Sequence, residues 1–122
     1  MWIFTQHGFF SVTRSIPEPE KFQVRARIRR DLENLLELMG WSDLPILETP
    51  DADYRFRLIV EPSQVTELMG RVVEKIDYSN FKNRIVKLPD QREKIDALHK
   101  VWELMYQFQS ETQVDETGEK LR

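Results

Sequence analysis

The chain has 122 residues, of which 40% are hydrophobic and 11% are aromatic, and its formal net charge is -3 at pH 7. This length and composition fit one domain with one hydrophobic core. The acidic balance argues against broad, sequence-independent binding of nucleic acid, which needs many uncompensated lysines and arginines, but it leaves room for a local anion site.

The absence of cysteine excludes disulfides, thiolate metal sites and a cysteine nucleophile. No apolar stretch approaches the ~20 residues that cross a bilayer, and the first residues lack the basic segment of a signal peptide. We therefore expect a cytoplasmic protein.

Three strand-like segments occupy the beginning of the chain. Residues 2–5 and 9–14 are rich in aromatic and β-branched side chains and predict either a short hairpin or one kinked strand. Residues 22–28 alternate apolar and polar side chains, which predicts another strand. Val24 and Ile28 also fit helical spacing, so a helix remains the alternative for this segment.

An amphipathic helix and a second strand pair follow. The apolar residues of the helix recur at helical spacing, and Gly40 is placed to end it. They are Ile28, Leu32, Leu35, Leu36 and Met39. Residues 46–48 and 54–60 predict two strands around a turn at Pro50.

Two further helices are predicted in the second half. The first begins at Pro62 and has apolar residues at helical spacing, and Asp90 with Glu93 resembles a capping box before the second. The segment 78–88 has no clear pattern. We predict a single α+β domain over 1–109 and a flexible polar tail over 110–122.

Together these elements predict an α+β fold. The best match is a ferredoxin-like two-layer sandwich with the order ββ(β)αββα and an extra C-terminal helix.

Arginines at alternate strand positions form the first candidate site. They are Arg25, Arg27, Arg55 and Arg57. Alternation places them on one sheet face and the apolar residues of both strands on the other. The apolar set comprises Phe22, Val24, Ala26, Ile28, Tyr54, Phe56, Leu58 and Val60. Such a face would bind a phosphate or carboxylate metabolite, or RNA. The alternative is pairing with the acids of the last helix, Glu93, Asp96 and Glu103.

A second candidate site is a polar cluster that contains an acid, a phenol, an amide and an amine. Its members are Asp77, Tyr78, Asn80 and Lys82. These residue types also suit a helix end. No complete catalytic motif accompanies them, so we assign no catalytic residue and lean against an enzyme. His7 and His99 have no metal-ligand spacing, and we predict no metal and no cofactor.

A wide apolar stripe marks the last helix as a candidate interface. Its residues are Val101, Trp102, Leu104, Met105 and Phe108. The stripe is wider than one contact surface on a helix, which favours self-association or a protein partner. The alternative is a groove between the sheet and another helix.

Several short segments also carry a likeness to known sequences. They are Met1-Trp2-Ile3-Phe4-Thr5, Gly8-Phe9-Phe10-Ser11, Val24-Arg25-Ala26-Arg27, Asp53-Tyr54-Arg55-Phe56-Arg57, Ile76-Asp77-Tyr78-Ser79-Asn80-Phe81-Lys82, and Val101-Trp102 with Met105. Taken together, they resemble an uncharacterised family of small bacterial proteins with no assigned activity. The resemblance implies a shared fold rather than a function.

The leading hypothesis is therefore a small non-enzymatic module that acts through protein contacts as a homodimer. The alternative is a binder or regulator of an anionic ligand through the arginine-lined sheet face. We expect no membrane partner.

Overall fold

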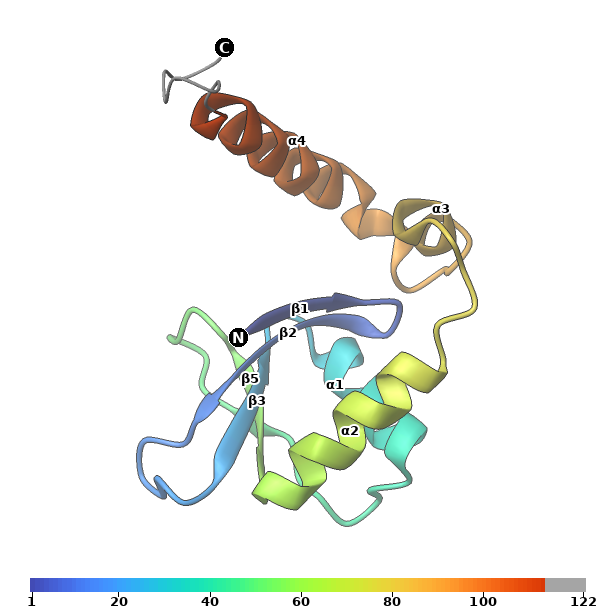
Figure 1. The fold of residues 1–122 in the computed structure, drawn as a ribbon. Helices are drawn as coiled ribbons and strands as arrows, with labels where there is room; N and C mark the ends of the chain where they lie inside the picture. The colour runs from blue at the N-terminus through green and yellow to red at the C-terminus, as the bar shows by residue number, and fades with distance from the viewer. Residues whose placement is uncertain (114–122) are drawn as a thin grey trace. The chain divides into compact units, whose positions relative to one another are not determined.

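The computed structural model describes residues 1–113. In this part of the chain the fold is α+β, with an open antiparallel sheet of five strands and four α-helices (Figure 1). The elements in chain order are β1 (Trp2–Thr5), β2 (Gly8–Arg14), β3 (Phe22–Ala26), α1 (Arg29–Met39), β4 (Leu47–Glu48), β5 (Phe56–Val60), α2 (Pro62–Glu74), α3 (Phe81–Val86), the 3-10 turn η1 (Arg92–Lys94) and α4 (Ile95–Thr112).

The sheet has the strand order β1-β2-β3-β5-β4, and every neighbouring pair is antiparallel. The predicted segments 2–5 and 9–14 form the hairpin of β1 and β2, and the segment predicted at 22–28 forms a strand, β3, rather than the alternative helix. Together with the helices, this confirms the α+β class. The ferredoxin-like two-layer arrangement is not confirmed by this strand order and stays a prediction.

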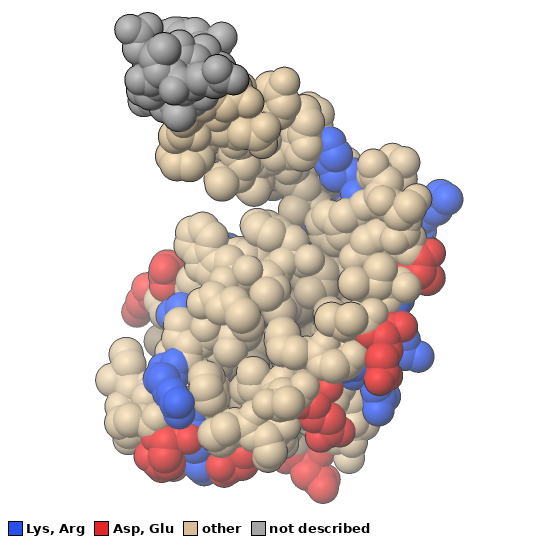
Figure 2. All heavy atoms as spheres, in the orientation of Figure 1, with Lys and Arg blue, Asp and Glu red and all other residues tan. Residues whose placement is uncertain are grey.

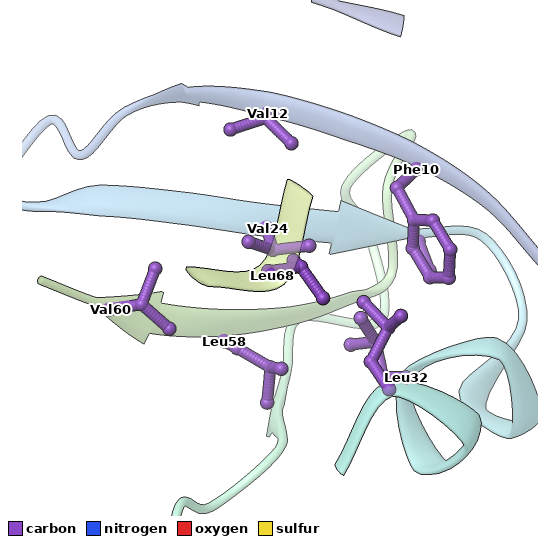
Figure 3. Close-up of a cluster of buried hydrophobic side chains, with 9 residues drawn as sticks. Phe10, Val12, Val24, Leu32, Leu58, Val60 and Leu68 are labelled. Atoms are coloured by element: carbon purple, nitrogen blue, oxygen red, sulfur yellow. The ribbon is translucent and has the colours of Figure 1, made fainter. Parts of the chain in front are cut away.

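The hydrophobic core lies between one face of the sheet and the helices α1 and α2 (Figure 3). Its fully or nearly fully buried side chains come from three strands and both helices. They are Phe10, Val12, Val24, Ala26, Leu58 and Val60 from the sheet, with Leu32 and Leu35 from α1 and Leu68 from α2. Each buried Val, Leu or Phe side chain contributes about 1.5–3 kcal/mol relative to an exposed position, which makes this cluster the main stabilising feature.

The turn between β1 and β2 depends on Gly8. Its φ is 155°, and a Cβ at this position would overlap the side chain of Asp31, which is 2% exposed. Asp31 lies in the first turn of α1 and accepts a hydrogen bond from the backbone N–H of Phe9 at 3.3 Å. The Thr5 hydroxyl donates to the carbonyl of Gly8 at 2.9 Å. Only glycine therefore allows the hairpin to approach α1 this closely.

The predicted ends of α1 and α2 agree with the structure. Gly40 ends α1 in the left-handed conformation with a φ of 68°, and Pro62 begins α2. Ile28 departs from its prediction, because β3 already ends at Ala26 and Ile28 stands before α1 in extended conformation. Its side chain is 48% exposed rather than part of the core.

The chain divides into two compact units, Met1–Phe81 and a second unit that begins at Lys82. The second unit contains η1 and α4, and α4 continues to Thr112, past the predicted domain boundary at residue 109. The remainder of the predicted tail, 114–122, lies outside the described residues. Among the helices of residues 1–113, none combines the length and the apolar character that crossing a bilayer requires.

Candidate functional site

The sheet face opposite the core, called the outer face below, carries a row of paired residues that crosses all five strands. The register pairs Trp2 with Ser11, Ser11 with Arg25, Arg25 with Arg57, and Arg57 with Leu47. Their sequence neighbours Val24 and Leu58 are fully buried in the core. The predicted separation of Arg25 and Arg57 from these apolar residues is therefore confirmed.

Four aromatic rings form a cluster beside the arginines, called the ring cluster below. Its members are Trp2, Phe4, Phe9 and Tyr54. Phe9 stacks on Phe4 with 4.5 Å between ring centroids and meets Trp2 edge-on at 6.1 Å. Tyr54 lies 6.4 Å from Phe9. Trp2 is 68% exposed and Phe4 is 37% exposed, so the cluster offers ring surface to solvent.

Tyr54 corrects one expectation from the sequence. Strand alternation assigned it to the core face, but its ring lies under two arginines, with the Cζ of Arg25 at 4.5 Å and that of Arg27 at 4.2 Å. The reason is that β5 begins at Phe56, so residue 54 precedes the strand and does not follow its alternation. These two contacts are cation–π interactions.

Arg25 and Arg57 are paired directly opposite each other, and the hydrogen bonds of both side chains go to neutral acceptors. The Nη2 of Arg25 donates to the hydroxyl of Ser11 at 2.8 Å, and Arg57 donates to Gln23 Oε1 at 3.5 Å and to the Tyr54 carbonyl at 3.3 Å. All three acceptors are neutral. Within Met1–Phe81, no carboxylate lies within ion-pair distance of either guanidinium. The Nε of each is buried with no hydrogen-bond partner in the described residues.

The other two predicted arginines differ from each other. Arg27 is exposed and donates to the carbonyl of Asp53 at 2.8 Å. Arg55 forms an ion pair with Glu48, with 2.9 Å between Nε and Oε1. Arg55 therefore already has its anion, and three of the four predicted arginines belong to the candidate face.

The predicted pairing with acids of the last helix stays a prediction. Within α4, Glu103 lies 3.4 Å from the Nε2 of His99. Within Met1–Phe81, Arg55 is the only one of the four predicted arginines that forms an ion pair with an acidic side chain.

The polar cluster lies in and after the loop between α2 and α3. Asn80 directly precedes α3, and the Tyr78 ring packs 5.9 Å from the ring of Phe81. Burial raises the pKa of the Tyr78 phenol above its usual value of 10.0, and the negative charge of Asp77 adds to this effect. The ammonium of Lys82 lies 4.7 Å over the ring of Trp102 within the second unit. Residues 1–113 contain no group of three or more acids and histidines placed to hold a metal ion.

The candidate interface on α4 is exposed along its whole length. No residue of α4 is buried, and the predicted interface residues are between 38% and 64% exposed. They are Val101, Trp102, Leu104, Met105 and Phe108. Tyr106, which the sequence prediction did not include, is 56% exposed.

Comparisons with protein-family models, with curated proteins and with solved structures found no match. The resemblance to a family of small bacterial proteins therefore stays a prediction.

Proposed function

We propose that this chain is a non-enzymatic binding module whose outer sheet face takes a short single-stranded stretch of nucleic acid. The observation that carries the proposal is the opposed pair Arg25 and Arg57, which has no acid within its unit and lies beside the ring cluster, in which Trp2 and Phe4 are exposed. Two like charges at directly paired strand positions repel each other. A phosphate placed between them would relieve this repulsion and accept hydrogen bonds from both guanidinium groups.

The ring cluster favours a nucleic acid strand over an isolated phosphate or carboxylate metabolite. Single-stranded nucleic acid is bound on open sheets by stacking its bases on aromatic side chains. Trp2 and Phe4 supply exposed rings on β1, and Arg25 lies two strands away in the same row as Trp2. This spacing of rings and guanidinium groups suits a ligand that alternates bases and phosphates.

The charge of the whole molecule limits how many phosphates take part. The net charge is -3, and on the side shown in Figure 2 acidic and basic side chains lie near each other without forming a continuous basic surface. A contact with a few phosphates is therefore expected rather than a long electrostatic groove. A cytoplasmic location is part of the same proposal, because a cysteine-free chain has no need of an oxidising compartment.

Fluorescence anisotropy with a labelled oligouridine at low salt tests the proposal. Arg57→Gln removes a cation from the opposed pair, whereas Arg55→Gln changes the net charge equally but removes the arginine already paired with Glu48. We expect Trp2→Ala to weaken binding roughly 5-fold or more, because base stacking is worth about 1–3 kcal/mol per base. Arg57→Gln should weaken binding by a similar factor, because a hydrogen bond to a charged group contributes about 1.5–3 kcal/mol. Arg55→Gln should change the affinity less than about 2-fold.

Two outcomes would overturn the proposal. One is a wild-type protein that does not bind the oligonucleotide at low salt. The other is an equal loss of affinity in Arg55→Gln and Arg57→Gln, which would assign the binding to overall charge rather than to the outer face. If inorganic phosphate or a nucleoside monophosphate bound with the same affinity as the oligonucleotide, the ligand would be a small phosphate metabolite rather than a nucleic acid strand.

A further inference from the structure

The helix α4 presents two different surfaces. On one, the Trp102 ring stacks on Tyr106 at 5.3 Å and on His99 at 5.9 Å, and it receives the cation of Lys82. The other surface is an apolar stripe, called the α4 stripe below. Its residues are Val101, Leu104, Met105 and Phe108, which follow each other at spacings of three, one and three positions. These spacings place them on one side of a helix.

The α4 stripe exposes more apolar surface than an isolated helix in water normally keeps. Its four side chains are 38%, 64%, 61% and 59% exposed in sequence order. Helices of this kind gain most of their stability from packing an apolar side against a partner, rather than from intrinsic propensity. A surface of this width on an 18-residue helix therefore indicates a contact.

The charges along the second unit indicate a second copy of the same helix, in antiparallel orientation. Residues 92–100 contain three basic and two acidic side chains, and residues 101–112 contain two acidic and no basic side chains. They are Arg92, Lys94 and Lys100 with Glu93 and Asp96 in the first segment, and Glu103 and Glu111 in the second. Antiparallel pairing sets each basic end beside an acidic end, and it also aligns the helix dipoles favourably. Parallel pairing would set the two acidic ends side by side.

We propose that the chain forms a two-fold symmetric dimer through the α4 stripe, with the two helices antiparallel. The inference goes beyond the proposed function and does not depend on it. Pairing about the point between Trp102 and Glu103 places Val101 beside Leu104 of the partner copy. It also places the small Ala97 opposite Phe108 and Lys94 near Glu111. A small residue facing a large one lets both helices approach closely.

The size of the α4 stripe sets the expected affinity. Its four side chains expose on the order of 400 Å² per copy, about half of the ~800 Å² per partner that stable interfaces bury. We therefore expect a dimer that forms in the micromolar range and dissociates on dilution.

Sedimentation velocity over micromolar to near-millimolar concentrations tests the dimer. The mass should rise from the monomer value of 14.7 kDa toward twice that value as the concentration increases. Leu104→Glu should abolish the rise, because it places two charges in the apolar contact. Gln107→Glu adds the same charge away from the α4 stripe and should leave the rise unchanged. Both positions are exposed, so helix content measured by circular dichroism should not differ between the variants.

A single spin label tests the orientation on the otherwise unchanged protein, because the chain has no other cysteine. With Glu111→Cys labelled, antiparallel pairing separates the two labelled backbone positions by roughly 25 Å along the helix axis, whereas parallel pairing leaves them within roughly 10 Å. The short distance would overturn the antiparallel arrangement. A monomer at every concentration, or a dimer that survives Leu104→Glu, would overturn the proposed interface.

Discussion

Tyr54 allows the packing of the outer face to be measured with two substitutions at one position. The residue is 3% exposed, and its phenolic Oη is buried with no hydrogen-bond partner in the described residues. A buried polar group without a partner costs about 1–3 kcal/mol. Tyr54→Phe removes that group and keeps the ring, so we expect the free energy of unfolding to stay the same or rise by about 1 kcal/mol.

Tyr54→Ala removes the ring as well, and we expect the opposite sign. Truncation of a buried aromatic side chain typically costs about 3–5 kcal/mol. The contacts of Arg25 and Arg27 with the ring each contribute about 0.5–1 kcal/mol within that total. Their guanidinium groups would also lose part of what compensates their charge. We expect a loss of about 4 kcal/mol, which is a large share of the stability of a small protein.

Urea unfolding followed by tryptophan fluorescence gives both values from the transition midpoints. The reasoning would be refuted if Tyr54→Phe lost more than about 1 kcal/mol, because the hydroxyl would then have a partner that stabilises it. A loss below about 1 kcal/mol in Tyr54→Ala would show that the ring does not hold the arginines in place.

Two glycines and one phenol give further tests. Gly8→Ala should lower the free energy of unfolding by roughly 2 kcal/mol or more, because the new Cβ overlaps the buried Asp31 side chain. Gly70→Ala within α2 should raise it by about 0.5–1 kcal/mol, since the added Cβ meets no atom within 4 Å and alanine favours the helix. Asp77→Asn should lower the pKa of Tyr78, as absorbance titration of the phenol would show. The folded state raises the Tyr78 pKa, so this phenol contributes stability that is present below its unfolded pKa of 10.0 and is lost as the pH rises above it.

The strands and helices could be predicted from the sequence because the patterns that indicate them involve residues close together in the chain. Alternation in 22–26 and 56–60 requires only that one side of each segment be apolar, and the buried Val24 and Leu58 confirm that choice. The ends of α1 and α2 depend on single residues, Gly40 and Pro62, whose backbone preferences act without distant partners. Such features can be predicted without knowing the register of the sheet.

The ring cluster could not be predicted from the sequence in the same way. Trp2 and Phe4 alternate with Ile3, and in the sequence all three simply favour a strand. Only the pairing of β1 with β2 shows that Phe9 stacks on Phe4 while Ile3 faces Phe10 and the core. Register depends on the whole hairpin and its turn, so the face that each aromatic ring occupies is a property of pairing rather than of composition.

Arg55 and Tyr54 show a related limit at a strand end. Both precede β5, which begins at Phe56, and extrapolating the alternation backward gave Tyr54 the wrong face. The ion pair of Arg55 with Glu48 involves β4, whose strand was predicted at 46–48, but which arginine Glu48 meets depends on the register of β4 with β5. The four arginines looked equivalent in the sequence, but the pairing of β4 with β5 leaves Arg25 and Arg57 as the pair without an acid in their unit.

The salt dependence of oligonucleotide binding distinguishes the contribution of the arginines on the outer face from that of the ring cluster. Three arginines, Arg25, Arg27 and Arg57, are available for phosphates, and single strands release about 0.7 counterion per phosphate contact. The logarithm of the affinity should therefore fall with the logarithm of salt concentration with a slope of about -2. Arg57→Gln should reduce the steepness by about 0.7, because one phosphate contact is lost. Trp2→Ala should weaken binding at every salt concentration and leave the slope unchanged, because stacking releases no counterions. An unchanged slope in Arg57→Gln would mean that the phosphates lie elsewhere on the protein, even if the affinity falls.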